Sequence, residues 1–493
     1  MSCSALPADG RRTPLEALER GLRAVNERPR FWLTFFALLL AAQIRPWWFP
    51  QADGRSFLSM AKSLAVDGHM RNLGRANLWY FPGYSLLLSP LYLIGERPFW
   101  LISAFQWSSA ILFMIGVYWW ARSVAPQWAV WIAGLSVLNE GVWIHCARTM
   151  SEVPFMCGLI WSANAALAAA RSRSWRRAIS LGALAAGLLA ITSLVRPAGI
   201  LLAVGFGLHL GWKAIRKETS WRRAAALTLL FGVPGSLTIS GFLRMEHATA
   251  AQQHTRTYLN NFSDSAANPL AAYIEGLRLA IRDSGRVVIP GMFKAYQEKG
   301  WRDLNLLVYL PACAILAIAW GRLVYETRDP LLLMTPFYVL LYVVYPYEAG
   351  ARFYIPLLPV FAASLVRLVL SLPARRHFIV ASVLCAHLML AAGYWLMTDA
   401  ARGREAMDRW REIDPIAQTI DCRRDRVIAL NASGDDVFML ELAIDRPIPF
   451  ERRESMPAGV EWIVAKRNAP AVPEFESCVE TDSLCLLRHR RPY

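Results

Sequence analysis

The sequence lacks several short motifs that identify common classes of enzyme. Its eight cysteines include no C-x-x-C pair, and its histidines show no metal-ligand spacing such as H-E-x-x-H. No P-loop is present and no G-x-G-x-x-G follows a strand, which argues against ATP hydrolysis and dinucleotide chemistry. A G-x-S-x-G serine elbow is also missing. Because these motifs are absent, the candidate catalytic and binding residues are individual charged side chains.

Charged residues are also scarce, at 18% of the 493 positions, whereas 55% are hydrophobic and 20 are tryptophan. Soluble domains are roughly 45–50% apolar, and the mean hydropathy here is +0.29. Several apolar stretches reach the roughly 20 residues that cross a bilayer as a helix. The composition therefore predicts an α-helical polytopic membrane protein in a cell membrane, with a bacterial inner membrane as the default.

The net charge of +16 would suggest nucleic acid as a partner in a soluble chain. Most of the basic residues, however, cluster in short loops between apolar stretches, as the positive-inside rule describes for cytoplasmic loops. The bilayer is thus the expected partner and nucleic acid is not.

We expect about eleven transmembrane helices, with the N-terminus cytoplasmic and the C-terminus extracytoplasmic. Residues 81–95 are short for a crossing and contain two prolines. If this stretch crossed, every Arg-rich loop would move outside, against the positive-inside rule. The expected spans lie near 31–48, 98–121, 127–145, 151–170, 178–195, 197–213, 222–243, 304–322, 331–347, 352–371 and 377–397.

Three regions follow from this topology. Residues 1–30 form a basic cytoplasmic arm with six Arg and no Lys. Residues 31–397 form the transmembrane domain, with extracytoplasmic loops at 49–97 and 244–303. Residues 398–493 form a small extracytoplasmic α/β domain, because helical spacing over 401–420 precedes short strand-like runs at 426–430, 460–464 and 483–487.

Asp53 is the first candidate for chemistry. It lies in the expected loop after the first span, where aromatic residues suit the membrane interface, and Gly54 beside it allows close approach of a ligand. A carboxylate placed there can take a proton from a hydroxyl or help to hold a divalent cation such as Mg²⁺ or Mn²⁺. The alternative is a solvated loop carboxylate that pairs with Arg55.

Glu152 and Arg196 are expected on the same face. Glu152 begins a long span, where Ser151 or Glu152 itself can cap the helix, since acids near a helix N-terminus gain roughly 0.3–1 kcal/mol from the dipole. The cap is compatible with a functional role. Arg196 interrupts two spans joined by almost no loop, and charges inside membranes tend to be functional; snorkelling of the side chain is the alternative.

Arg352 is the strongest basic candidate. The stretch from Tyr345 to Pro356 places its fork of donors beside tyrosines, including Tyr347, at the expected outer mouth. Arginine suits a phosphate group because its paired donors lie in one plane. A simple ion pair between Glu348 and Arg352 at helical spacing is the alternative.

Taken in order, these pieces resemble the GT-C glycosyltransferases, in particular the group containing protein O-mannosyltransferases and the lipid A aminoarabinose transferase. The resemblance covers roughly residues 30–400, and it depends on the order of short motifs together with the topology. The motifs are Asp53 after the first span, Phe81-Pro82-Gly83-Tyr84-Ser85-Leu86-Leu87-Leu88, Thr149-Met150-Ser151-Glu152, Leu194-Val195-Arg196-Pro197, and Arg352-Phe353-Tyr354-Ile355-Pro356.

The resemblance implies a membrane glycosyltransferase that transfers a sugar from a polyprenyl-phosphate donor to a lipid, glycan or protein acceptor on the extracytoplasmic face. It places Asp53 and Glu152 as catalytic acids, which are also the candidate ligands for a divalent cation. It places Arg352 at the donor phosphate. Arg196, Tyr347 and Tyr84 complete the expected substrate-binding set. Mannosyltransferases typically carry an Asp-Glu pair after the first span, whereas Asp53 is followed by Gly54, which places protein O-mannosylation and a paired metal site in doubt.

Two other classes remain open. A transporter or flippase for a lipid-linked or anionic substrate predicts charges near the midplane of the spans and broken helices in related halves. A non-enzymatic scaffold that presents the tail gives no reason for acids and arginines to collect on one face.

Overall fold

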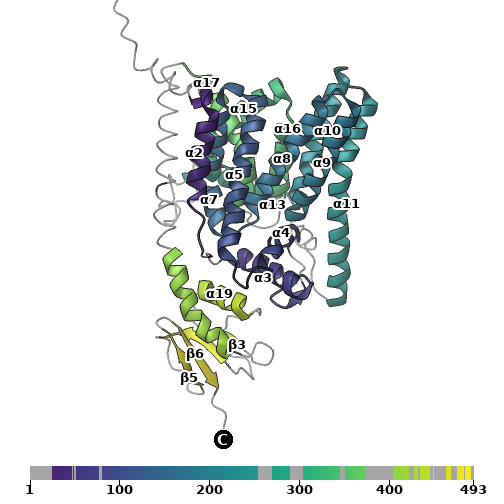
Figure 1. Ribbon diagram of the computed structural model, residues 1–493. Helices are drawn as coiled ribbons and strands as arrows, with labels where there is room; N and C mark the ends of the chain where they lie inside the picture. The colour runs from purple at the N-terminus through teal and green to yellow at the C-terminus, as the bar shows by residue number, and fades with distance from the viewer. Residues whose placement is uncertain are drawn as a thin grey trace, which may run out of the picture.

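The structure is a computed structural model. It describes residues 25–46, 48, 51–76, 80–253, 269–288, 304–344, 350–373, 393, 403–420, 427–430, 434–444, 448, 462–467, 475–481 and 484–489. Within these residues a bundle of long helices occupies one part of the molecule, two shorter helices lie across one end of the bundle, and a small sheet lies beyond them (Figure 1).

Six helical segments among the described residues are long and apolar enough to cross a membrane. They bury apolar faces against one another; helix α8, for example, packs between α5 and α9. The six match six of the expected spans closely. They are α5 (Phe99–Val124), α8 (Glu152–Arg171), α9 (Trp175–Val195), η2 with α10 (Pro197–Ile200, Leu201–Ile215), α11 (Trp221–Gln253), and η4 with α17 (Ala351–Leu357, Leu358–Leu370).

The other expected spans differ in detail. Helix α2 (Pro29–Ala41) ends earlier than expected, shortly before Arg45 and Pro46. Proline disfavours the helical conformation of the residue that precedes it, so the helix is not expected to continue through Arg45. The segment expected at 127–145 is bent by 47° between η1–α6 and α7. Helices α15 and α16 cover the spans expected at 304–322 and 331–347. Apart from residue 393, the span expected at 377–397 lies outside the described residues, so a total of eleven stays a prediction. The bounds are η1 Pro126–Trp128, α6 Ala129–Val137, α7 Glu140–Ala147, α13 Pro269–Val288, α15 Leu304–Thr327 and α16 Pro330–Val343.

The expected loop around Asp53 is largely helical, which corrects the sequence-based expectation. Helix α3 (Ala52–Asp67) holds Asp53 in its first turn, and a short β1–β2 ribbon (Arg71–Asn72, Arg75–Ala76) leads to α4 (Gly83–Tyr92). Helix formation is favoured because Phe57, Leu58 and Ala61 recur at helical spacing and are all buried. Helix α4, at 10 residues, is too short to span a bilayer.

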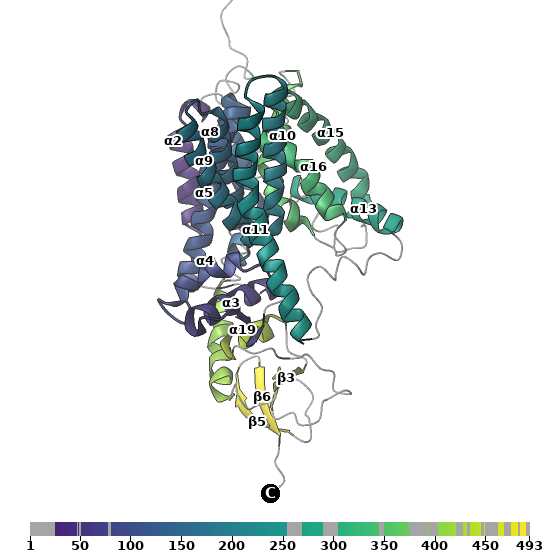
Figure 2. The ribbon, with the colours of Figure 1, turned by 90° about the vertical axis from the view of Figure 1, so that its right-hand side faces the viewer.

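The tail contains a four-stranded sheet in the order β3-β4-β6-β5. Strands β3 and β4 pair in parallel, and the other two pairs are antiparallel. Three strands match the expected positions, and β5 was not predicted. Helix α19 and the helical residues 403–419 lie between the sheet and the bundle (Figures 1 and 2). The bounds are β3 Val427–Leu430, α19 Gly434–Ile444, β4 Trp462–Lys466, β5 Phe475–Glu480 and β6 Leu484–His489.

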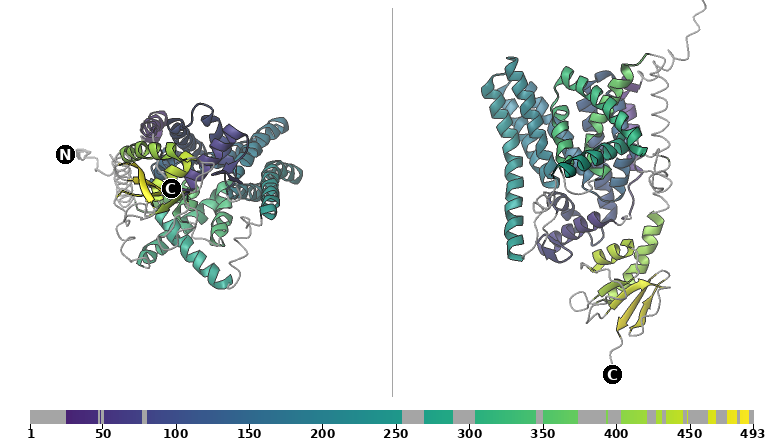
Figure 3. Two further views of the ribbon diagram at one scale, coloured as in Figure 1. Left: turned by 90° about the horizontal axis from the view of Figure 1, so that it is seen from below. Right: turned by 180° about the vertical axis from the view of Figure 1, so that it is seen from behind.

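The basic turns and the tail lie at opposite ends of the bundle. The connection between α10 and α11 is at the end far from α3 and the sheet (Figures 2 and 3). Arg223 at the start of α11 donates to the carbonyl of Ser172, so the turn between α8 and α9 lies at the same end. Glu152 begins α8 and Arg171 ends it, which separates them by about 30 Å at 1.5 Å per residue. The arrangement is therefore compatible with the expected polarity.

Candidate active site

Asp53 is held by two donors from distant parts of the chain. Its Oδ1 accepts a hydrogen bond from the hydroxyl of Tyr80 at 2.9 Å, and its Oδ2 lies 2.5 Å from Nη1 of Arg352. About a quarter of the Asp53 side chain is exposed, and 31% of Arg352. The alternative pairing of Asp53 with Arg55 is wrong, because Arg55 pairs with Glu441 instead.

Glu152 and Arg196 form a second pair that is almost fully buried. Arg196 Nη2 donates to Glu152 Oε1, and Arg196 Nε donates to Ser151 Oγ at 3.1 Å. Glu152 is 0% exposed. Ser151 makes no side-chain cap at the start of α8, so its hydroxyl serves Arg196 rather than the helix. Because Arg196 is paired inside the protein, it does not snorkel.

Arg352 joins the two pairs. Its Nε lies 4.0 Å from Glu152 Oε1, while its Nη1 contacts Asp53. The ring of Phe353 lies 4.9 Å from the guanidinium carbon of Arg352 and 5.0 Å from that of Arg196, so one ring contacts both cations. Four charged residues, two of each sign, thus form one contiguous cluster.

Two buried atoms of this cluster have unused hydrogen-bonding capacity. Glu152 Oε2 and Arg196 Nη1 are buried and have no hydrogen-bond partner among the described residues. Buried polar atoms are nearly always paired in native proteins. Glu152 Oε2 therefore has the capacity to accept, and Arg196 Nη1 the capacity to donate, one further hydrogen bond.

Backbone contacts fix the two short helices against the cluster. A Cβ added to Gly54 would lie 2.9 Å from the carbonyl oxygen of Arg148, and one added to Gly83 would lie 2.4 Å from the backbone carbon of Leu194. These glycines let α3 close on the turn before Glu152 and α4 on the turn before Arg196. Thr149, in the first of these turns, has φ of +54°, which costs a non-glycine residue energy and is common at functional sites.

Tyr80 remains a hydrogen-bond donor over the physiological pH range. Burial, reinforced by the negative charge of Asp53, raises the pKa of its phenol to about 12. Its ring meets Phe57 edge-on at 5.1 Å, and Phe57 in turn meets Tyr84 at 5.0 Å. The hydroxyl that binds Asp53 is thus supported by a row of packed rings.

The remaining predicted binding residues stand apart from this cluster. Tyr84 is fully buried, and its hydroxyl accepts a hydrogen bond from Gln106 on α5. It therefore packs inside the protein and is not open to a substrate. Tyr347 lies outside the described residues, as does Glu348, the alternative partner of Arg352. The structure therefore brings together Asp53, Glu152, Arg196 and Arg352 of the predicted set.

The donor set does not fit a divalent cation. The two candidate carboxylates are each engaged by a guanidinium group, and Arg352 lies within ion-pair distance of both. No group of three His, Cys, Asp or Glu in the described part of the chain is arranged to hold a metal ion.

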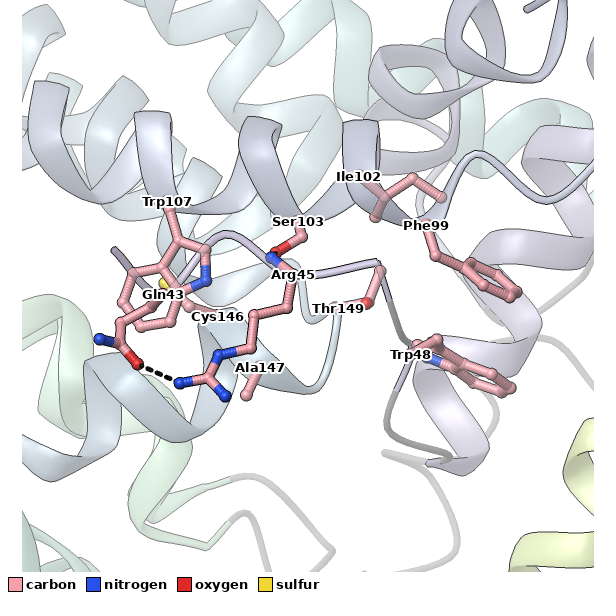
Figure 4. Close-up of a pocket in the computed structure, with 10 residues that line it drawn as sticks. All are labelled: Gln43, Arg45, Trp48, Phe99, Ile102, Ser103, Trp107, Cys146, Ala147 and Thr149. Carbon is pink, nitrogen blue, oxygen red and sulfur yellow. Dashed lines mark hydrogen bonds between the residues drawn. The ribbon is translucent and has the colours of Figure 1, made fainter. Parts of the chain in front are cut away.

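A hollow lined by Trp48, Trp107 and Thr149 is too small for a substrate. Figure 4 shows it between Trp48, Arg45 and Trp107, with Arg45 bonded to Gln43 at 3.2 Å. Its volume of about 10 Å³ corresponds to roughly one water. The indole nitrogen of Trp48, a residue that lines the hollow, is buried without a hydrogen-bond partner among the described residues.

A much larger groove lies elsewhere in the bundle. It has a volume of about 370 Å³ and lies between α13, α15, α16 and α17. Its lining is almost wholly apolar, including Leu277, Leu316 and Val339. Tyr342, next to the lining residue Val343, packs on Phe353 at 4.8 Å. The residue beside one edge of the groove therefore contacts the ring that both guanidinium groups approach.

Comparison with solved structures shows what this arrangement is similar to. The chain is similar to ArnT from Cupriavidus metallidurans bound to undecaprenyl phosphate, with a TM-score of 0.53 and 12% identity over 92% of this chain and 97% of that one. It is also similar to the archaeal oligosaccharyltransferase AglB from Archaeoglobus fulgidus in complex with an inhibitory peptide and a dolichol-phosphate, with a TM-score of 0.54 and 11% identity over 89% and 69%.

The chain thus shares its fold with solved membrane glycosyltransferases that resemble it at 11–12% identity. The resemblance inferred from the short motifs is thereby confirmed for the fold. No protein-family model and no curated protein matches the chain. At 11–12% identity the likeness concerns architecture, and the chemistry has to be argued from the site.

Sequence reasoning missed Tyr80 and Phe353 as parts of the site, although Phe353 lies within one of the motifs that it singled out and Tyr80 borders another. Tyr80 immediately precedes Phe81, and Phe353 follows Arg352. The available signal was the aromatic residue adjacent to each motif. What the signal could not supply is that Tyr80 folds back on Asp53, 27 positions away.

Proposed function

We propose that this protein is a membrane glycosyltransferase that takes a sugar from a polyprenyl-phosphate donor. The observation that carries the proposal is the cluster in which Arg352 and Arg196, both stacked on Phe353, lie beside the partly exposed carboxylate of Asp53. Such a cluster offers a base for a hydroxyl and cations for a phosphate leaving group within one site.

The reaction assigns each group one task. Asp53 takes the proton from the acceptor hydroxyl, whose oxygen attacks the anomeric carbon of the sugar. The bond between that carbon and the phosphate oxygen breaks, and the electron pair leaves with the lipid phosphate. Arg352 and Arg196 stabilise the negative charge on that leaving group, because donors aimed at developing charge stabilise the transition state.

Glu152 has the task of holding the cations. Its Oε1 accepts from Arg196 and lies 4.0 Å from Arg352. A buried carboxylate between two guanidinium groups keeps them oriented and reduces their mutual repulsion. Glu152 therefore acts through the arginines rather than on the sugar.

The phosphate of the sugar donor and the carboxylate of Asp53 would compete for Arg352. In the structure Arg352 occupies Oδ2 of Asp53 while Tyr80 occupies Oδ1, so both oxygens of the base are engaged. A phosphate that recruits Arg352 would release Oδ2 for the acceptor hydroxyl. The proposal thus includes an order of events, in which the donor binds before the acceptor is activated.

The apolar groove beside Phe353 supports a lipid carrier. A volume of about 370 Å³ with an apolar lining suits an acyl or prenyl chain. Tyr342, which precedes the lining residue Val343 in α16, packs on Phe353, whose ring lies near both guanidinium groups. A phosphate held by Arg352 would consequently place its lipid chain toward α13 and α15. The presence of undecaprenyl phosphate in ArnT and dolichol-phosphate in AglB agrees with this class of carrier.

The site would face the extracytoplasmic side, with the Arg-rich turns in the cytoplasm. The acceptor would be a lipid, a glycan or a protein that reaches this face. The test is to incubate purified protein with a panel of polyprenyl-phosphate sugars and candidate acceptors and to follow release of polyprenyl phosphate by mass spectrometry. Release above a no-enzyme control is expected. A flippase, the competing possibility, would leave every donor intact while moving it across proteoliposomes.

A further inference from the structure

The tail contacts α3 beside the candidate base. Arg55, two residues after Asp53, pairs through Nη1 with Oε2 of Glu441 on α19, and its guanidinium carbon lies 4.9 Å from the ring of Phe438. The side chains of Arg55 and Glu441 are only 18% and 5% exposed. Glu441 is held in turn by the backbone amide of Ile448, which donates to Oε1 at 2.7 Å.

A second contact holds the tail at the start of α5. Arg97 lies 2.6 Å from Asp414 and stacks over the ring of Trp410 at 4.5 Å. Trp410 also packs on Phe99 and Trp48 at 5.5 and 6.3 Å between ring centroids. The tail is thus docked on the bundle at two separate points, and Figures 1 and 2 both show α19 beside α3.

The first turn of α3 is consequently held from both sides. Residues two apart on a helix point in directions about 200° apart, so Asp53 and Arg55 face opposite ways. Asp53 is paired with Arg352 of the bundle, and Arg55 is paired with Glu441 of the tail. The N-cap residue Gln51 makes no side-chain cap bond, so tertiary contacts rather than local capping determine where this turn lies.

We propose that Glu441 is a positioning residue for Asp53, acting through Arg55. The tail then is a part of the active site's support rather than an independent appendage. This inference rests on the proposed function for its kinetic consequence, but the structural coupling between α19 and the first turn of α3 stands apart from any reaction. A displacement of a reacting group by about 1 Å can cost roughly 100-fold in rate.

The test compares Glu441→Gln with Glu480→Gln, which removes a tail carboxylate whose pair with Arg467 is about half exposed. Two readouts are taken on the full-length protein in detergent: hydrogen exchange of the amides in residues 52–58, and kcat and KM for carrier release. We expect Glu441→Gln to speed exchange in this segment and to lower kcat by about 10- to 100-fold with an unchanged KM for the donor. Glu480→Gln is expected to match wild type.

Arg55 provides the check from the other side of the pair. Arg55→Gln should reproduce the effects of Glu441→Gln even if the latter folds poorly, and Arg55→Lys, which keeps the charge, should restore most of kcat. Wild-type exchange in residues 52–58 of both Gln variants would overturn the positioning role. If the wild-type protein releases no carrier from any donor, the proposed function fails while the exchange measurement still decides the coupling.

Discussion

Arg352 Nη1 lies 2.5 Å from Asp53 Oδ2, across 299 positions of sequence. The contact joins the segment that opens η4 to the first turn of α3, and it brings together one candidate base and one candidate phosphate ligand. Because each is the other's partner in this structure, each is expected to influence the other's function, and the following predictions separate their roles.

Replacement of Asp53 by Asn removes the proposed base and keeps the shape of the side chain. General base catalysis contributes roughly 10²–10⁴-fold to rate, so carrier release should fall by about that factor. Membrane insertion should be unaffected. Asp67→Asn, at the exposed end of the same helix, is the control. Wild-type turnover in Asp53→Asn would end the assignment of Asp53 as base.

Replacement of Arg352 by Gln should weaken binding of the lipid phosphate. A hydrogen bond to a charged group is worth about 1.5–3 kcal/mol, which corresponds to roughly 10- to 150-fold in affinity. Titration with undecaprenyl phosphate by calorimetry measures this directly. Arg322 is exposed and lies near the C-terminal end of α15, so Arg322→Gln should bind undecaprenyl phosphate as the wild type does. Equal affinity in both variants would show that Arg352 does not contact the phosphate.

Replacement of Gly54 by Ala should displace α3. The added Cβ would lie 2.9 Å from the Arg148 carbonyl, closer than such atoms approach, and overpacking costs typically about 1–3 kcal/mol. A lower thermal midpoint and a loss of carrier release of at least about tenfold are expected. Gly187→Ala, in open space within α9, should keep or raise the midpoint. Full activity in Gly54→Ala would show that α3 tolerates a shift.

Replacement of Glu152 by Gln leaves Arg196 buried without its counter-charge. Breaking a buried pair in this way costs about 3–5 kcal/mol. The free energy of unfolding in mixed micelles is the measurement. The pair between Arg367 and Glu326 is 43% exposed on both sides, so Glu326→Gln should cost no more than about 1 kcal/mol. Similar costs for the two variants would mean that the Glu152 pair is not a closed, buried contact.

Tyr80 gives the fold a specific dependence on alkaline pH. Its pKa is raised from 10 to about 12 because burial disfavours the phenolate and Asp53 adds repulsion. The folded state therefore binds the phenol proton of Tyr80 more tightly than the unfolded state does. The contribution of this proton to the free energy of unfolding is intact below pH 10 and is lost as the pH rises toward 12. The loss amounts to at most about 2.7 kcal/mol, at 1.36 kcal/mol per unit.

Unfolding followed between pH 9 and 12 tests this contribution. Tyr80→Phe should lose less stability over that interval than wild type, whereas Tyr273→Phe, at a residue that is 45% exposed, should follow wild type. Identical curves for wild type and Tyr80→Phe would contradict the raised pKa.

The sequence predicted the membrane class, six spans and four members of the cluster, because each of these depends on local information. An apolar run of about 20 residues identifies a span by itself, and Arg196 between two such runs is conspicuous. The pairings were not predictable. The partners proposed from sequence, Arg55 for Asp53 and Glu348 for Arg352, were near neighbours, whereas the described partner of Asp53 is 299 positions away.

Helix α3 was mistaken for a loop because Pro50 and Gly54 dominate its beginning. The buried residues Phe57, Leu58 and Ala61 follow one another at helical spacing. This short pattern is hard to recognise because it comes soon after the long apolar run of the first span. Strand β5 was missed for a related reason. Its central residues are exposed and polar, and it forms the edge of the sheet, so alternation of apolar residues is absent.

The single ring of Phe353 beneath both guanidinium groups makes the two cations mechanically dependent. A change in the size of this ring is expected to alter the distance between the two guanidinium groups and to leave the number of charges unchanged. Phe353 is accordingly the position at which a substitution is expected to alter the spacing of the two guanidinium groups that are proposed to bind the carrier phosphate, without removing either ion pair.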